Sequence, residues 1–202
     1  MKTCLVIGKP NAGKTAFVLA FAAYLGLSTV SVRAIAPDGG IVTRSFVLTD
    51  AGRDLVGAAP HKTTCLQSLE IVLPAGKARR TCELLDSTGL TEQIHDNDAI
   101  RRGMAQTLRS LRQAAVVLHL IDASRADRVG AIECLSDLDH QVADYVSGRS
   151  AYAVLASKMD LPGAKRGLQL IRDAFPRQRV IPVSAVKRWG MGEVRAFVAK
   201  AV

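Results

Sequence analysis

Residues 8–15 have the residue types and the spacing of a loop that binds phosphate groups. They read Gly-Lys-Pro-Asn-Ala-Gly-Lys-Thr and fill every fixed position of the pattern G-x-x-x-x-G-K-[ST]. An apolar run, 4–7, precedes the loop, and an Ala- and Leu-rich stretch, 16–27, follows it. A strand, this loop and a helix in that order direct backbone N–H groups and the helix N-terminus toward an anion. We therefore expect nucleoside triphosphate binding; a Gly/Pro turn with a chance Lys-Thr leaves the flanking strand and helix unexplained.

The fixed positions of this loop have distinct chemical roles. Gly8 and Gly13 let the backbone wrap closely around the phosphates. Lys14 reaches the β- and γ-phosphates as a point charge, and the Thr15 hydroxyl coordinates Mg²⁺. The predicted nucleotide contacts in this segment also include Asn11, Ala12 and Ala16.

A second candidate set follows the strand-like run 151–156. Ser157-Lys158-Met159-Asp160 matches x-K-x-D, a weak pattern alone because Lys and Asp are common in loops after strands. An Asp carboxylate accepts two hydrogen bonds from guanine N1–H and N2–H₂, which adenine cannot offer, while a Lys stem packs over the ring. The position of this segment, one element before Ser184-Ala185, makes it informative. It predicts that Asp160 selects guanine.

A third candidate set, the D-x-x-G segment Asp86-Ser87-Thr88-Gly89, follows the strand-like run 81–85. Asp86 would hold Mg²⁺ through water, and the Gly89 N–H would contact the γ-phosphate until hydrolysis removes it. A simple turn is the alternative. Upstream, Thr64 lies at a plausible distance to give Mg²⁺ a hydroxyl ligand, and Thr63 is the other choice.

The remaining pattern predicts the elements that position these residues. Two β-branched runs, 29–36 and 41–48, flank the turn cluster at 37–40 and predict a hairpin. Further strands are expected at 66–73, 81–85, 115–121, 151–156 and 180–183, and helices at 16–27, 99–112, 129–146, 165–175 and 192–201. Strands that alternate with helices predict a largely parallel sheet covered on both faces, with the nucleotide at the strands' carboxyl ends.

Length and composition indicate one globular domain over residues 1–202. The chain has 49% hydrophobic and 22% charged residues and no Pro-, Ser- or acid-rich stretch that would mark a boundary. The amino terminus enters a strand directly, and segment 16–27 is too short to span a bilayer. The four cysteines show no metal-binding spacing. These features predict a reduced, cytoplasmic protein.

The net charge of +9 predicts attraction to polyanions. RNA, an anionic membrane surface and an acidic protein are all candidates, and the charge does not choose among them. The basic residues are scattered, and no aromatic residues interleave with them as in nucleic-acid-binding motifs. Solvated faces explain them better than one binding surface. His119, inside the apolar strand 116–121, is most simply a core or sheet-face residue.

With these segments in order, and with Val183-Ser184-Ala185 after the last strand, the chain resembles the Ras-like P-loop GTPases of the translation-factor-related class. Its phosphate loop is most similar to the Era-like bacterial subgroup. The resemblance runs from Lys2 to the final helix. It implies an α/β, three-layer GTPase domain with a six-stranded, mostly parallel sheet, one antiparallel edge strand, and a hairpin insertion at about 28–50 before switch I. It also implies guanine recognition by Ser184, by the Ala185 backbone amide and by the adjacent Val186.

The resemblance implies a switch that hydrolyses GTP to GDP and phosphate with magnesium, and that an unidentified effector or activator reads. Lys14, magnesium and the loop amides would neutralise developing charge, while Thr64 and Gly89 couple phosphate loss to the switch segments. A nucleotide-dependent scaffold with negligible turnover is an alternative function. An ATP-using P-loop enzyme is a third, disfavoured by the guanine-reading pattern.

Three departures from the family pattern qualify this reading. Ser157 stands where the family has Asn, so guanine affinity is expected to be lower. Leu90 stands where Ras-like members carry a water-orienting Gln, so intrinsic hydrolysis should be slow. Relatives with an apolar residue there often bind potassium through the Asn that matches Asn11, which makes potassium stimulation a hypothesis. The third departure is the insertion at about 28–50, which either extends the sheet edge or binds a partner.

Overall fold

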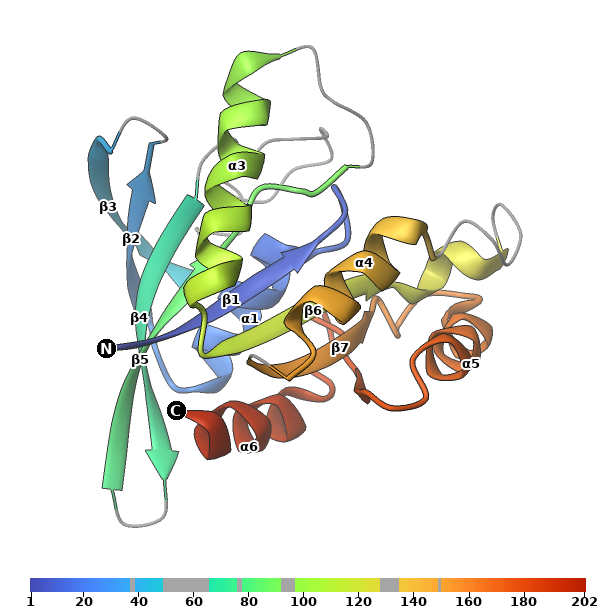
Figure 1. The fold of residues 1–202 in the computed structure, drawn as a ribbon. Helices are drawn as coiled ribbons and strands as arrows, with labels where there is room; N and C mark the ends of the chain where they lie inside the picture. Colours follow the sequence, from blue (N-terminus) through green and yellow to red (C-terminus); the bar gives the residue numbers. More distant parts are fainter. Residues whose placement is uncertain (37–38, 49–65, 76–77, 92–96, 128–134, 149) are drawn as a thin grey trace.

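A single mixed β-sheet with helices on both faces forms the framework of the computed structural model (Figure 1). The structure describes residues 1–36, 39–48, 66–75, 78–91, 97–127, 135–148 and 150–202. The strands are β1 (Lys2–Gly8), β2 (Thr29–Ile35), β3 (Ile41–Val47), β4 (Leu66–Ala75), β5 (Ala78–Asp86), β6 (Val116–Asp122), β7 (Ala151–Ser157) and β8 (Arg179–Pro182). The helices are α1 (Lys14–Tyr24), α3 (Asp98–Gln113), the short 3₁₀ helix η1 (Ala123–Asp127), α4 (Asp137–Val146), α5 (Ala164–Ala174) and α6 (Met191–Ala201).

The strands β5-β1-β6-β7-β8 lie parallel to one another and form the half of the sheet that carries the candidate site. Parallel neighbours need crossover connections, and helices α3, α4 and α5 supply them between β5, β6, β7 and β8. The carboxyl ends of these strands therefore meet at one edge of the sheet, as the alternating sequence pattern predicted.

The expected number of six strands is wrong, because the sheet has eight strands in the order β3-β2-β4-β5-β1-β6-β7-β8, although one edge strand, β3, is antiparallel to its neighbour as expected. The hairpin at 28–50 forms β2 and β3, and β2 pairs antiparallel with β4. The strand β4 is therefore interior, and β3 is the edge. Arg33 Nη2 fixes this extension by donating to Ser68 Oγ on β4 at 3.1 Å and to Glu83 Oε1 on β5 at 2.6 Å.

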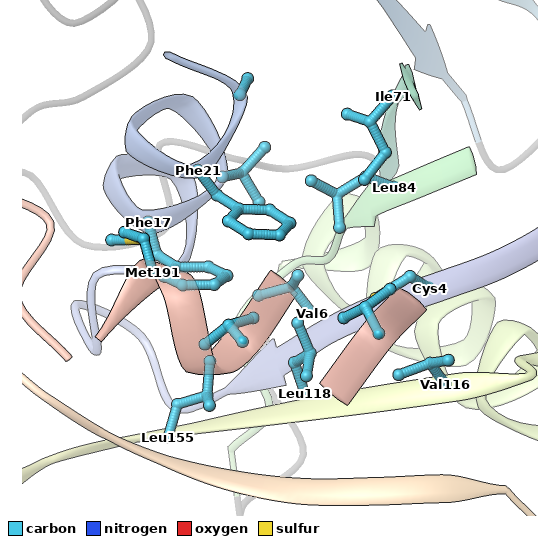
Figure 2. Packing of buried hydrophobic residues seen from close by; sticks show 14 of the residues in the cluster. Cys4, Val6, Phe17, Phe21, Ile71, Leu84, Val116, Leu118, Leu155 and Met191 are labelled. Carbon is cyan, nitrogen blue, oxygen red and sulfur yellow. The ribbon is translucent and has the colours of Figure 1, made fainter. Parts of the chain in front are cut away.

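Two apolar clusters fill the spaces on either side of the sheet. One packs α1 and α6 against it, with Phe17, Phe21 and Met191 over β1 and β6 (Figure 2). The other packs α3, α4 and α5 against the opposite face. Alternate residues of β1 enter the two clusters, Cys4 and Val6 on one side and Leu5 and Ile7 on the other, as the period of a strand requires.

Most expected elements are present with shifted ends. Helix α1 begins at Lys14, directly after the phosphate loop, and β4 and β5 extend to Ala75 and from Ala78. Helix α4 begins at Asp137 rather than 129, because a capping box between Ser136 and Asp139 starts it there. Among the residues that the structure describes, no helix is long and apolar enough to cross a membrane.

Candidate nucleotide-binding site

The phosphate loop joins β1 to α1 through a backbone with positive φ at Gly8, Asn11 and Gly13. Gly8 has φ +145°, and a Cβ there would lie 2.3 Å from the Leu120 carbonyl oxygen. Asn11 and Gly13 also have positive φ, +62° and +93°. Asn is one of the few non-glycine residues that adopt this conformation readily. The loop is thus held tightly against β6, with its last turn leading into α1.

Lys14 lies folded over the loop rather than extended into solvent. Its side chain is 7% exposed, and Nζ donates to the carbonyl oxygens of Gly8 at 3.1 Å and Lys9 at 2.9 Å. Burial lowers the pKa of Lys14 to about 8, although the nearby Asp86 carboxylate raises it in part. The lysine is therefore a desolvated cation at the centre of the loop, where an anionic ligand would stabilise its charge.

Asp86, at the end of β5, meets the first turn of α1. Its Oδ2 accepts a 2.6 Å hydrogen bond from the Thr15 hydroxyl, while Oδ1 is buried without a hydrogen-bond partner among the described residues. Burial raises the pKa of Asp86 to about 6, against the opposing effects of the Thr15 hydrogen bond and the Lys14 charge. An unpaired carboxylate oxygen beside a hydroxyl fits the oxygen ligands that Mg²⁺ prefers. The predicted third ligand, Thr64 or alternatively Thr63, lies outside the described residues.

The D-x-x-G segment runs along the phosphate loop. The Ser87 N–H donates to the Val6 carbonyl at 3.3 Å, and the Leu90 N–H donates to the Gly8 carbonyl at 3.1 Å. A Cβ on Gly89 would lie 2.7 Å from Pro10, so only glycine fits this approach. The Leu90 side chain is 3% exposed and packs in the cluster under α3. It lies in the core, where it cannot orient a water molecule.

The carboxyl end of β7 is bonded directly to the phosphate loop. The Ser157 hydroxyl is buried and lies 2.8 Å from the Ala12 carbonyl oxygen and 3.1 Å from that of Ile121. A hydroxyl has one hydrogen to donate, so these two carbonyls share it. Ser157 therefore connects the loop, β6 and β7 at one point, despite being shorter than the family's Asn.

Lys158 follows with φ +59° and lies across the loop. Its Nζ donates to Asp122 Oδ2 at 2.7 Å, and its Cε would lie 4.0 Å from a Cβ on Gly13. Asp122 Oδ1 in turn accepts hydrogen bonds from the backbone N–H and the hydroxyl of Ser124. The sequence reasoning missed Asp122, although an Asp at the end of an apolar strand is the signal that found Asp86.

Asp160 is oriented by the loop after β8. The Ser184 hydroxyl donates to Asp160 Oδ1 at 2.6 Å and accepts from the Lys187 N–H at 3.0 Å. Ser184 is fully buried and Ala185 half-buried, whereas Val186 is 78% exposed. One carboxylate oxygen of Asp160 is thereby held by Ser184, a contact that the sequence did not predict.

Residues 3–158 of the chain match the protein family described as 50S ribosome-binding GTPase. The chain belongs to this family of GTPases. The Era-like resemblance that the motif order predicted is thus confirmed.

Curated relatives of this GTPase are longer than the chain itself. The GTPase Obg of Akkermansia muciniphila is 29% identical over 178 residues, which are 84% of this chain and 49% of that protein. The GTPase Obg of Bacillus cereus is 27% identical over 146 residues, 70% of this chain and 33% of that protein. The chain therefore spans about half of the first relative's length and a third of the second's.

Solved structures share the fold of this GTPase. Era in complex with MgGDPNP and nucleotides 1506–1542 of 16S ribosomal RNA gives a TM-score of 0.67 at 19% identity, covering 99% of this chain and 56% of that one. The cytosolic domain of L. pneumophila FeoB gives a TM-score of 0.60 at 19% identity, covering 99% and 70%.

Beside the nucleotide site of this GTPase lies a buried polar network that the sequence reasoning did not find. Lys9 Nζ lies 3.5 Å from Asp139 Oδ2 on α4, and Asp139 Oδ1 lies 3.0 Å from His119 Nε2. In its neutral form His119 therefore donates through Nε2, and Nδ1 accepts from the Tyr152 hydroxyl at 2.9 Å. Burial alone would raise the pKa of Asp139. The contacts with His119 and Lys9 have a larger, opposite effect, so the pKa of Asp139 lies below its ordinary value. His119 is buried, as expected, and also links β6 to the phosphate loop through Asp139.

Proposed function

We propose that the chain is a guanine-nucleotide switch that hydrolyses GTP to GDP and phosphate with magnesium. The observation that carries this proposal is the Ser157 hydroxyl, 2.8 Å from the Ala12 carbonyl oxygen. It joins the candidate guanine-reading segment to the phosphate loop in one rigid unit. A nucleotide whose base and phosphates both meet this unit is a better ligand than inorganic phosphate or a nucleobase alone.

The roles of the individual residues follow from their chemistry. Thr15 and Asp86 would hold magnesium, which supplies charge stabilisation at the phosphates when bound. Lys14 would exchange its hydrogen bonds to loop carbonyls for the β- and γ-phosphates. The Gly89 N–H would contact the γ-phosphate, and its release on hydrolysis would let the D-x-x-G segment move. Thr64 would complete the switch from the segment before β4.

Nucleotide competition with an Asp160→Asn variant tests the guanine assignment. Wild-type protein should bind GTP and GDP far more tightly than ATP, because only guanine offers two donors to a carboxylate. Asn presents an N–H₂ donor in place of one oxygen, so the variant should lose GTP affinity and gain affinity for xanthosine triphosphate. Equal binding of ATP and GTP, unchanged by the substitution, would contradict the proposal.

A switch with negligible turnover is the second candidate, and the buried Leu90 side chain favours it. Single-turnover cleavage of GTP distinguishes the two, because a scaffold would bind GTP and leave it intact.

Potassium stimulation of GTP hydrolysis is a further hypothesis. Asn11 is exposed at the outer bend of the loop and matches the position that holds potassium in relatives. Equal rates of phosphate release in sodium and potassium would remove that hypothesis.

RNA or the ribosome is the partner class best supported by similarity, since the neighbouring Era structure contains a 16S ribosomal RNA fragment. The net charge of +9 is compatible with this partner and with an anionic membrane surface. We also propose a cytoplasmic location, because Cys4 and Cys82 are free thiols and GTP is an intracellular metabolite. Salt-dependent binding to ribosomal RNA, compared with binding to anionic vesicles, separates the two surfaces.

A further inference from the structure

Helices α3 and α4 enclose a groove of about 360 Å³ on the sheet face opposite α1 and α6. Both helices lie on that face and diverge in the view of Figure 1, and residues of both line the groove. Leu111 of α3 and Val142 of α4 are buried and form its floor. Leu108, 50% exposed, and Tyr145, 37% exposed, form apolar parts of its rim. Apolar residues therefore line the groove from its floor to its edges.

The spacing of these side chains matches the contact surface of a third helix. Leu108 and Leu111 lie three residues apart on α3, and Val142 and Tyr145 lie three apart on α4. Two helices with such ridges leave a channel into which the apolar face of another helix packs.

Cations flank this apolar groove. Arg109 and Arg112 both line it, and neither forms an ion pair within the part of the chain that the structure describes. Arg101 and Arg102, near the start of α3, are instead paired with Asp98. The exposed acidic residues of α4, Asp137 and Asp144, do not line the groove. The groove thus presents apolar surface and unpaired positive charge together.

We propose that this groove binds an acidic amphipathic helix of a partner protein. Arginine forks pair well with carboxylates at interfaces, and the apolar floor excludes water around them. Single-stranded RNA needs several aromatic platforms, whereas Tyr145 is the one aromatic residue among those that line the groove. A membrane surface would require a protruding apolar face rather than a concave one.

Each wall of the groove is tied to a different part of the nucleotide site. In α3, Thr107 lies next to Leu108, and its hydroxyl is 3.0 Å from that of Thr88, directly before Gly89. In α4, Asp139 contacts Lys9 of the phosphate loop at 3.5 Å. Thr88, Thr107 and Asp139 are all buried, so neither wall can shift without disturbing these contacts.

A rearrangement of the D-x-x-G segment on GTP hydrolysis would therefore move α3 relative to α4 and change the width of the groove. The partner helix should bind one nucleotide state more tightly than the other. This step rests on the proposed switch function. Binding of the helix to nucleotide-free protein depends only on the groove.

Fluorescence anisotropy with a designed peptide tests both steps. The probe is a labelled helical peptide of about 16 residues, with Leu at three- and four-residue spacing on one face and Glu on both flanks. It is titrated with the full chain without nucleotide, with GDP and with a nonhydrolysable GTP analogue, while calorimetry records nucleotide binding separately. We expect saturable binding in all three forms and at least about a fivefold difference between the two nucleotide forms.

Matched variants locate the peptide and the coupling. Arg112→Glu and Leu108→Asp should weaken binding by about tenfold or more, whereas Arg102→Glu, on the same helix outside the groove, should not. Thr107→Val removes the contact with Thr88 but no lining residue, so it should keep peptide binding and reduce the difference between nucleotide forms.

The outcomes separate the inference from the proposed function. The groove assignment would be overturned if the peptide did not bind, or if Arg112→Glu left its affinity unchanged. It would also be overturned if a peptide with Lys in place of Glu bound equally well, or if an RNA oligonucleotide bound instead. Equal peptide affinity with GDP and with the analogue would overturn the coupling. Failure of nucleotide to bind at all would end the switch proposal, while peptide binding to nucleotide-free protein would still support the groove.

Discussion

The phosphate end of the candidate site, Lys14 and Asp86, and its proposed guanine end, Ser157–Asp160, differ in how burial and hydrogen bonds act on their polar groups. At the phosphate end, Lys14 and Asp86 are buried. Burial lowers the pKa of Lys14 and raises the pKa of Asp86, so it favours the neutral form of each. At the guanine end, Ser157, Lys158 and Asp160 each have a hydrogen-bond partner in the folded chain. The charges of Lys14 and Asp86 are thus disfavoured by burial despite their own hydrogen bonds, and a ligand would stabilise them. The polar groups at the guanine end already stabilise the fold.

This difference indicates which substitutions should change ligand affinity without changing the free energy of unfolding. A residue whose charge is disfavoured by burial should contribute strongly to ligand affinity and little to folding. A residue that is fully paired inside the protein should contribute to both in similar measure.

Lys14→Met should give the largest separation. The variant keeps the length of the side chain but removes its charge, so GTP affinity should fall about a thousandfold. The free energy of unfolding without nucleotide should change by less than about 1 kcal/mol, because the desolvation of the cation offsets its hydrogen bonds. Calorimetry and urea unfolding measure the two quantities. Lys165→Met on the exposed face of α5 is the control, and a stability loss of several kcal/mol in Lys14→Met would contradict the contrast.

Gly8→Ala should lower the free energy of unfolding, because the backbone at the phosphate end leaves no room for a side chain at this position. The new Cβ would lie 2.3 Å from the Leu120 carbonyl oxygen, so β1 and β6 would have to separate, at a cost of about 3 kcal/mol. Gly13→Ala is the matched comparison, since a Cβ there would lie 4.0 Å from Lys158 Cε, an ordinary van der Waals distance. It should cost about 1–2 kcal/mol through its positive φ alone. Similar losses in the two variants would show that strain, not contact, limits both positions.

Asp139 on α4, which contacts His119 and also Lys9 of the phosphate loop, has a charge that stabilises the fold, and Asp139→Asn tests this contribution. The pKa of Asp139 in the folded chain lies below its ordinary value of 3.8. Its charge therefore stabilises the folded state above pH 3.8, and this stabilisation is lost as the pH falls through the folded-state pKa. The variant should be less stable by about 2 kcal/mol at pH 7, and the difference should shrink as the pH falls below 3.8 and through the folded-state pKa of Asp139. Urea unfolding across this range measures the difference. A constant difference at every pH would assign the effect to packing instead.

Several candidate residues lie in short segments of the sequence that the structure brings together. The loop 8–15, Asp86 and Asp160 lie at strand ends, and both the strands and the spacing are local properties. The structure brings the loop against Asp86 and Ser157 through contacts of 2.6 and 2.8 Å. The binding roles of all the candidate residues remain predictions; Thr64 lies outside the described residues, and Val186 is exposed.

What the sequence did not predict depends on contacts between distant segments. The hairpin itself was predicted, but its pairing with β4 rests on Arg33 reaching Ser68 and Glu83. The Lys9–Asp139 contact is likewise invisible in any local pattern. An ion pair leaves no periodic signal, so tertiary structure alone reveals which lysine meets which aspartate.

Ser157→Ala should have the smallest effect and complete the contrast. Removing the hydroxyl leaves the Ala12 and Ile121 carbonyls without this donor, so the free energy of unfolding should fall by about 1 kcal/mol. GTP affinity should fall by about tenfold, since the loop and β7 are no longer fixed to each other. Lys14→Met would then lower affinity without lowering stability, and Ser157→Ala would lower both. If Ser157→Ala instead lowered affinity alone, the serine would act on the nucleotide directly, and the guanine end would resemble the phosphate end.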